Sequence, residues 1–156
     1  MKKQKGFTLL ETVIVIVILI IVAAIAAPEF RRMAINGNLK AAAKDLMSDI
    51  IRTRAKAISE NNPNFSMVFD QANNNYTVPA LQSANLETKS PVYFASDITI
   101  SSIAFDGGST LTFQTRGTIS PASPASKTLT LVNSRGSAAT ITITTTGRVY
   151  VEYSLQ

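Results

Sequence analysis

An uninterrupted apolar run dominates the start of the chain. All 15 residues from Val13 to Ala27 are Val, Ile, Leu or Ala, and upstream of them, from Phe7 on, the only polar side chains are Thr8, Glu11 and Thr12. At a rise of about 1.5 Å per residue, a helix of 21 residues from Phe7 to Ala27 spans about the hydrocarbon core of a bilayer. The pattern therefore predicts a membrane-spanning helix.

Glu11 is the one charged residue within this helix. A carboxylate in an apolar segment costs roughly 2.5–3.5 kcal/mol on insertion scales, so it marks a candidate functional site with a cationic partner. The alternative is that Glu11 lies at headgroup level near the helix end, where water solvates it.

Helical periodicity continues beyond the apolar run, from Glu29 to about Ser59. One broad face carries the apolar residues Phe30, Met33, Leu39, Ala43, Leu46, Ile50 and Ala57. This predicts an amphipathic helix whose apolar stripe lies on a sheet. Pro28 lacks an amide donor and Asn36-Gly37-Asn38 has poor helix propensity, so the segment between them is expected to stretch, unwind or kink. The run from Asn61 to Asn64 predicts the helix end.

After this helix the sequence alternates apolar and polar residues with the period of strands. The apolar positions are Phe65, Met67 and Phe69; Tyr76 and Val78; Val92, Tyr93 and Phe94; Ile98 and Ile100; Ile103 and Phe105; Leu111 and Phe113; Leu129 and Leu131; Ile141 and Ile143; and Val149, Val151 and Tyr153. Loops are expected over Ala80 to Ser90 and Ser120 to Pro124, and a change of phase predicts a bulge near Ser101-Ser102. We expect an α+β fold in which a long N-terminal helix packs on an antiparallel β-rich C-terminal domain of roughly seven or eight strands.

Most of the net positive charge of the chain lies ahead of the apolar run. The formal net charge is +5, but three of these charges are Lys2, Lys3 and Lys5, ahead of the apolar run. Without them +2 remains, from 5 minus 3. The basic character therefore favours an orientation with the N-terminus inside and the soluble part outside the cytoplasm, and it does not favour nucleic-acid binding.

The composition leaves little room for catalysis. The chain has no Cys and no His, so it has no disulfide, no thiolate and no imidazole ligand or base. Asp45 and Asp49 lie one helical turn apart and are expected to form a solvated stripe. We find no paired nucleophile and base, no phosphate loop and no metal-ligand pattern, so we expect neither an enzyme nor a cofactor.

The string of lysines, Gly6, Phe7 and Glu11 resembles the class III signal of type IV pilins and type II secretion pseudopilins. The resemblance implies that a prepilin peptidase cuts after Gly6 and that the new amine of Phe7 is methylated. It also implies that Glu11 guides subunit docking and that Pro28 breaks the helix. An ordinary secretory signal cut after Ala26 also fits the basic start and the apolar run, although a glutamate at the entrance of that run is not expected.

Three later stretches are similar to the minor pseudopilin H (GspH) and FimT-like group: Arg52 to Ile58, Phe113 to Gly117, and Thr145 to Val149. The resemblance implies three regions, namely a leader (1–6), a transmembrane and assembly helix (7–28) and a periplasmic domain (29–156). It implies a single-pass subunit of the bacterial inner membrane that enters a type II secretion pseudopilus or a type IV pilus, at or near its tip. Its expected partners are other pilin-type subunits, the prepilin peptidase, the membrane and secreted cargo.

The sequence is also compatible with two other functions. Some FimT-like minor pilins bind DNA in natural transformation, an activity associated with a C-terminal Gly-Arg-x-Arg pattern. Here Gly147-Arg148-Val149-Tyr150 lacks the second arginine. Arg116, Arg135, Arg148 and Lys127 would have to converge to bind DNA, and we expect such binding to be weak at most. The second alternative is an ordinary membrane-anchored or secreted domain.

Overall fold

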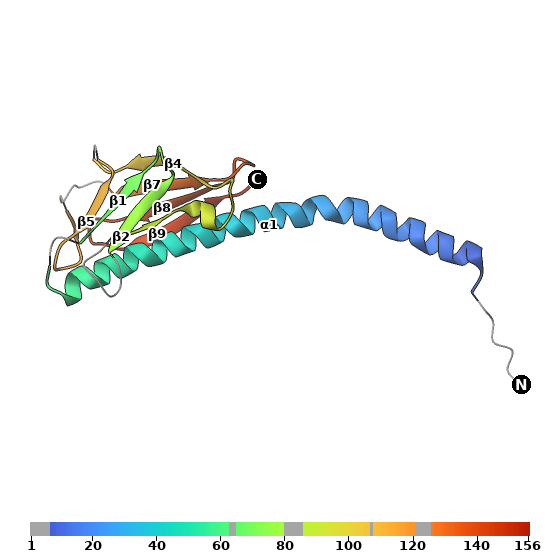
Figure 1. Cartoon of the computed structure of the whole chain (residues 1–156), viewed down its shortest axis with the longest axis horizontal. Helices are drawn as coiled ribbons and strands as arrows, with labels where there is room; N and C mark the ends of the chain where they lie inside the picture. Colours follow the sequence, from blue (N-terminus) through green and yellow to red (C-terminus); the bar gives the residue numbers. More distant parts are fainter. Residues whose placement is uncertain (1–6, 63–64, 80–85, 107, 121–125) are drawn as a thin grey trace, which may run out of the picture. The chain divides into compact units, whose positions relative to one another are not determined.

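The computed structural model describes residues 7–62, 65–79, 86–106, 108–120 and 126–156. Over these residues the protein has one long helix, α1 (Leu9–Ser59), nine strands and one short 3-10 helix (Figure 1). In chain order the later elements are β1 (Ser66–Asp70), β2 (Asn75–Pro79), β3 (Leu86–Lys89), η1 (Pro91–Tyr93), β4 (Thr99–Ala104), β5 (Thr110–Phe113), β6 (Ile119–Ser120), β7 (Lys127–Val132), β8 (Ala138–Ile143) and β9 (Val149–Ser154). The chain divides into two compact units, Met1–Ala34 and Ile35–Gln156, and each contains part of α1.

In the first unit, α1 begins at an N-cap formed by Thr8. The Thr8 hydroxyl accepts a hydrogen bond from the backbone N–H of Glu11 (3.2 Å), and the Thr8 carbonyl accepts one from the backbone N–H of Thr12 (3.2 Å). A threonine followed three residues later by a glutamate is a sequence signal for a helix start, because its side chain satisfies an amide that has no partner inside the helix. The start of α1 is therefore encoded locally.

The helix runs through Pro28 without interruption. The expectation that the helix breaks at Pro28 is therefore wrong, because α1 is continuous through this residue. A proline inside a helix removes one amide hydrogen bond and clashes with the preceding turn, which costs about 3 kcal/mol. A long helix can remain continuous in spite of this cost. The second predicted weak point, Asn36-Gly37-Asn38, is also helical.

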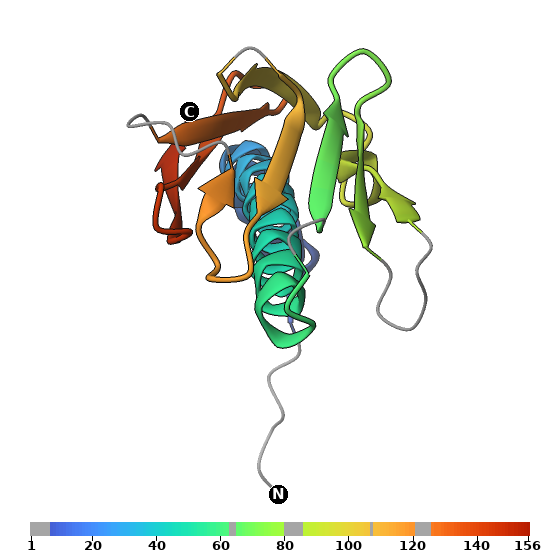
Figure 2. The same ribbon diagram turned by 90° about the vertical axis from the view of Figure 1, so that its left-hand side faces the viewer.

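In the second unit, the strands form two antiparallel sheets. One has the order β3-β2-β1-β5-β6 and the other β4-β7-β8-β9. Figures 1 and 2 show both sheets on the same side of this part of α1. The helix turns its buried face toward them: Asn36, Leu39, Ala42, Ala43, Leu46, Asp49, Ile50, Thr53 and Ala57.

The alternating positions of the strands supply the rest of the core. Met67, Leu111, Phe113, Ile119, Leu129, Leu131, Ile141 and Ile143 are fully buried together with Leu39 and Ile50 of α1. Hydrogen bonds between described residues join the two sheets, and one of them runs from Gln71 Nε2 to the Ser101 carbonyl (2.7 Å). The backbone N–H of Ile119 donates to the Thr145 carbonyl (3.3 Å), and the side chain of Asn74 donates to the Ile98 carbonyl (2.8 Å) and accepts from the Ile100 N–H (2.8 Å).

The structure confirms most of the expected strands, but two segments differ from the expectation. The bulge near Ser101-Ser102 is confirmed by a register shift between Ile100 and Ser102. Strand β3 occupies part of the predicted loop between Ala80 and Ser90, and the predicted strand at Val92 to Phe94 overlaps η1 instead. The reason is local: Pro91 fixes a helical φ, and the Ser90 hydroxyl caps the turn by accepting from the Val92 N–H.

The predicted apolar face of the helix was too long. Phe30 and Met33 were placed on it, but both are exposed and belong to the first unit. Burial of the α1 face begins at Asn36, because only the second unit has sheets for the helix to cover.

Candidate functional site

The most conspicuous surface of the first unit is apolar and uncovered. Every large apolar side chain from Val13 to Ile25 is exposed, and Phe7 is 79% exposed. Part of α1 is long and apolar enough to span a membrane, and no residue in that stretch is buried. An apolar surface of this extent marks a membrane or protein interaction site, because in water it would drive association.

Glu11 lies in the first turn of this helix, directly behind the Thr8 cap. The helix macrodipole makes this end positive, so an anion is favoured there. In the described part of the chain, no cationic side chain forms an ion pair with Glu11, and the ion pairs that are present involve other residues. The predicted cleavage partner Gly6 lies outside the described residues, whereas Phe7 is the first residue described.

In the second unit, the three stretches singled out in the sequence meet at the end of α1. Arg54 donates from Nε to the Gly117 carbonyl (2.8 Å) and from Nη2 to the Thr146 carbonyl (3.5 Å). One arginine on the helix therefore binds the β5–β6 turn and the β8–β9 turn at once. We call Arg54, Gly117 and Gly147 the Arg54 junction; it ties α1 to both sheets.

Glycine is required at both turns of the Arg54 junction. Gly147 has φ +78°, and a Cβ there would collide with the Gly117 carbonyl oxygen and lie 2.6 Å from Arg54 Nε. A Cβ on Gly117 (φ +77°) would lie 2.7 Å from Ile58 Cδ1. The two turns can approach each other and Arg54 only because neither residue has a side chain.

A polar junction lies at the other end of the docked part of α1. The buried Asn36 donates from Nδ2 to the Gln156 carbonyl (3.1 Å) and accepts through Oδ1 from Ser137 Oγ (2.8 Å) and Asn133 Nδ2 (3.2 Å). These bonds hold the helix to the β7–β8 turn and to the residue after β9. They give a physical reason why the poor helix former Asn36 is helical here: its side chain is fully used in tertiary contacts.

Asp49 corrects the expectation of a solvated stripe. Its side chain is completely buried, whereas that of Asp45 is 37% exposed. Lys89 Nζ lies 2.8 Å and 3.0 Å from its two carboxylate oxygens, Arg52 Nη2 lies 2.9 Å from Oδ1, and the Tyr76 hydroxyl donates to Oδ2 at 3.1 Å. Burial, reinforced by the negative charge of Asp49, raises the pKa of the Tyr76 phenol far above its ordinary value of 10.0. The cluster pins the edge strand β3 to α1.

The predicted cations do not form one DNA-binding surface. Arg116 and Arg148 are exposed and adjoin the two glycines of the Arg54 junction, so the turns bring their backbones together. Arg135 lies instead on the β7–β8 turn, beside Asn133 and Gly136. The prediction that Lys127 contacts DNA is wrong. Its side chain is 2% exposed and its Nζ pairs with Asp106 Oδ2 at 3.1 Å, so it cannot contact DNA in this conformation.

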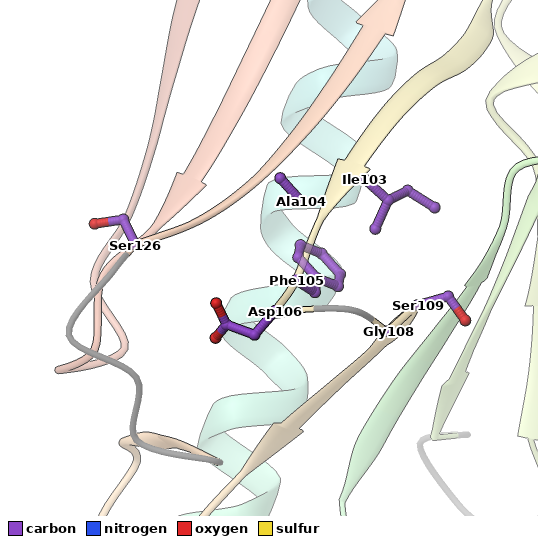
Figure 3. A pocket seen from close by; sticks show the side chains of 7 residues that line it. All are labelled: Ile103, Ala104, Phe105, Asp106, Gly108, Ser109 and Ser126. Atoms are coloured by element: carbon purple, nitrogen blue, oxygen red, sulfur yellow. The ribbon is translucent and has the colours of Figure 1, made fainter.

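A hollow lies beside the end of β4 (Figure 3). The described residues that line it are Ile103, Ala104, Phe105, Asp106, Gly108, Ser109 and Ser126. Asp106 is its only ionisable residue, and its carboxylate is already paired with Lys127. Over the described ranges, no three carboxylates come together as a metal site would require.

An apolar helix of membrane length that continues into the core of an antiparallel β domain defines the pilin-like class of proteins. Residues 1–27 match the prokaryotic N-terminal methylation motif. Residues 42–147, more than half of the chain, match the family described as Type II transport protein GspH. The chain belongs to the GspH family.

Solved structures agree with this fold. The chain is similar to the type IV minor pilin FimU of Pseudomonas aeruginosa in two crystal forms, at 20% sequence identity in both. The TM-scores are 0.54 and 0.56, over 73% and 75% of this chain and 92% and 90% of FimU. No curated protein sequence matches the chain.

The protein is thus a minor pilin or pseudopilin, which assembles with other pilin-type subunits after processing of its N-terminus. Its family is structural and not enzymatic. The sequence resemblance to this superfamily and to its GspH-like branch is therefore confirmed. Sequence reasoning missed Asp49 and Asn36 as buried anchors; a buried partner across the sheets cannot be recognised from helical spacing alone.

Proposed function

We propose that the protein is cut between Gly6 and Phe7, methylated on the new Phe7 amine and held by residues 7–28 in the bacterial inner membrane. Residues 29–156 then lie on the periplasmic side. From there the subunit enters a type II secretion pseudopilus or a type IV pilus, at or near the tip. The observation that carries this proposal is the uncovered apolar helix with a single carboxylate in its capped first turn.

The driving force for assembly is retained burial. In the bilayer, lipid covers the exposed side chains from Val13 to Ile25. In a filament, the same surface packs against the helices of other subunits, so little apolar area returns to water. A subunit can then leave the membrane without the full cost of exposing its anchor.

Glu11 gives the assembly its register. Cleavage after Gly6 leaves a positive amine on Phe7, at the positive end of the helix macrodipole. In apolar surroundings an unpaired charge is expensive, so the carboxylate of one subunit pairs with the amine of an adjacent subunit. The pairing offsets part of that cost and sets the axial offset between the two helices.

The processing step is tested by the intact mass of the mature protein. We expect a mass that corresponds to Phe7–Gln156 plus one methyl group. A mature N-terminus at Ala27 would mean that the apolar helix is discarded, and the assembly proposal would then fail.

The docking step is tested by Glu11→Leu, with Glu29→Leu as the control. Both glutamates are exposed on α1 in the first unit, but only Glu11 lies in the capped first turn. Glu11→Leu should still insert and be cut, yet fail to enter filaments or to co-purify with partner subunits. Glu29→Leu should assemble normally. Assembly of Glu11→Leu at wild-type levels would leave Glu11 as a solvated residue at headgroup level.

A further inference from the structure

The two sheets have four edge strands, and three of these edges are protected. Strand β6 has only two residues, and the four-residue β3 is held to α1 through Lys89. Strand β4 is bulged between Ile100 and Ser102. The side chains of Gln71 and Asn74 also bind its backbone. Short edges, bulges and covered edges prevent a sheet from pairing with a further strand.

Strand β9 lies at the remaining edge and has none of these protections. It pairs with β8 through all six of its residues without a register shift, so it has no bulge. It contains no proline and no lysine, and its only charged residue is Glu152. Within the described ranges, no strand lies beyond it. An edge of this kind is a template for strand addition.

The register of the β8–β9 hairpin shows which backbone groups point to the free edge. The Thr144 N–H donates to the Arg148 carbonyl (2.9 Å), and in an antiparallel pair every second residue repeats this arrangement. The even-numbered residues of β9 therefore bond to β8. The N–H and C=O groups of its odd-numbered residues, Val149, Val151 and Tyr153, point away from β8, and no hydrogen bond between described residues reaches them.

The side chains along this edge carry a charge pattern. Arg148, Tyr150 and Glu152 are exposed, whereas Val149 and Val151 are partly buried and pack against the core. The three exposed side chains lie on one face, because residues two apart in an extended chain point the same way. An antiparallel partner strand matches both charges when it has a basic residue opposite Glu152 and an acidic residue opposite Arg148.

We propose that the free edge of β9 binds an extended segment of another protein, which joins the β4-β7-β8-β9 sheet as a fifth, antiparallel strand. The segment carries a basic residue and, four residues later, an acidic residue, with apolar or aromatic residues between them. Backbone hydrogen bonds at Val149 and Val151 supply the affinity, and the two charges select the register.

A second copy of the chain would match the same charges, but the direction of β9 argues against it. Within the second unit, α1 runs from Asn36 to Arg54. The β9 segment runs back, from Gly147 beside Arg54 to Gln156, whose carbonyl binds Asn36. In an antiparallel pair of two copies, the helices would leave in opposite directions, and one membrane could not hold both. This step rests on the proposed membrane anchoring.

Peptide binding to the full chain in detergent tests the proposal. The probe is a fluorescent peptide with the sequence of residues 147–153, which has an arginine and a glutamate four residues apart. The control peptide has this arginine and glutamate exchanged, so its composition is the same but antiparallel pairing sets like charges opposite each other. We expect the control peptide to bind about tenfold more weakly.

Exchanging the same charges on the protein should reverse the preference. The double variant Arg148→Glu, Glu152→Arg should bind the control peptide more tightly than the probe. Both side chains are exposed, so the variant should fold, and an unchanged thermal unfolding midpoint checks this. Equal binding of the two peptides to either protein, or no binding of the probe to the wild-type protein, would overturn the inference.

Backbone methylation tests whether the peptide binds as a strand. In the register that the charges select, the two valines of the probe lie opposite Val149 and Val151 and need their N–H groups, whereas the N–H of its central tyrosine points away from β9. N-methylation of both valines should abolish binding, and N-methylation of the central tyrosine should weaken it much less. Equal effects of the two modifications would contradict strand addition. Because this assay involves neither processing nor assembly, its failure would leave the proposed function standing.

Discussion

The buried carboxylate of Asp49 should be among the costliest side chains to remove from this protein. Its side chain is fully buried, and it is bound by Lys89, Arg52 and Tyr76. Asp49→Ala leaves these three groups facing a small cavity without their acceptor. The residue Tyr76 is only 3% exposed, while the side chains of Lys89 and Arg52 are 18% and 34% exposed.

The expected loss follows from these exposures. Removing one partner of a fully buried ion pair costs about 3–5 kcal/mol, because an uncompensated charge remains. Lys89 and Arg52 can each turn partly to solvent, so we expect about 3 kcal/mol, at the lower end. For a unit the size of Ile35–Gln156, this corresponds to a fall in Tm of about 10 °C. Asp49→Asn, which can still accept from Tyr76, should lose less.

The assay is thermal or urea unfolding of the full chain in detergent, followed by near-UV circular dichroism of the tyrosines. Asp45→Ala is the matched control, one helical turn away on α1. Its carboxylate is 37% exposed and 3.8 Å from Lys89 Nζ, so its removal should cost less than about 1 kcal/mol. Equal losses for Asp49→Ala and Asp45→Ala would refute the argument that burial of the ion pair sets the cost.

Three further predictions concern the turns, the pH response and nucleic acid. Gly136→Ala should cost about 1–2 kcal/mol, because its φ is +79° while its Cβ would make only ordinary van der Waals contact with the Gln156 side chain, at 3.5 Å or more. Gly147→Ala should cost clearly more or prevent folding, because its Cβ would also collide with the neighbouring turn; equal unfolding midpoints would contradict this. The pKa of Tyr76 is raised in the folded state, so the stability contributed by its neutral phenol is complete below a pH of about 10 and is lost as the pH rises above that value. The unfolding free energy of Tyr76→Phe should therefore fall less steeply in alkali than that of the wild-type protein. Duplex DNA should bind weakly at low salt and not at physiological salt. The double variant Arg116→Ala, Arg148→Ala should bind still less at low salt. Tight binding at physiological salt that is lost in Arg148→Ala would establish DNA capture instead.

Much of the second unit could be predicted because strands such as β7 and β8 bury one face. Leu129 and Leu131, or Ile141 and Ile143, alternate with threonines, and this pattern alone reports which side faces the core. The prediction failed where a short-range signal competed with the pattern. At Val92 to Phe94, apolar residues indicated a strand, but Ser90 and Pro91 favour a capped helical turn. Strand β3 has mostly exposed residues and could not be recognised by burial at all.

The sequence by itself determined the features that depend on neighbouring residues. The apolar length of Phe7 to Ala27, the helix start at Thr8 and the glycines of the tight turns all follow from the chemistry of a few consecutive residues. The leader motif belongs to this class, since its recognition also depends on a short contiguous string.

Only the tertiary structure decided which polar side chains are buried. Asp49 and Lys127 resemble surface residues in the sequence, yet each is buried because a partner from another element reaches it, Lys89 in one case and Asp106 in the other. Arg54 likewise resembles a residue that favours a helix C-terminus, and it instead binds carbonyls from turns 63 and 92 residues away in the chain. The free energy of burying a charge depends on the groups that surround it in space, and helical or strand spacing carries no information about them.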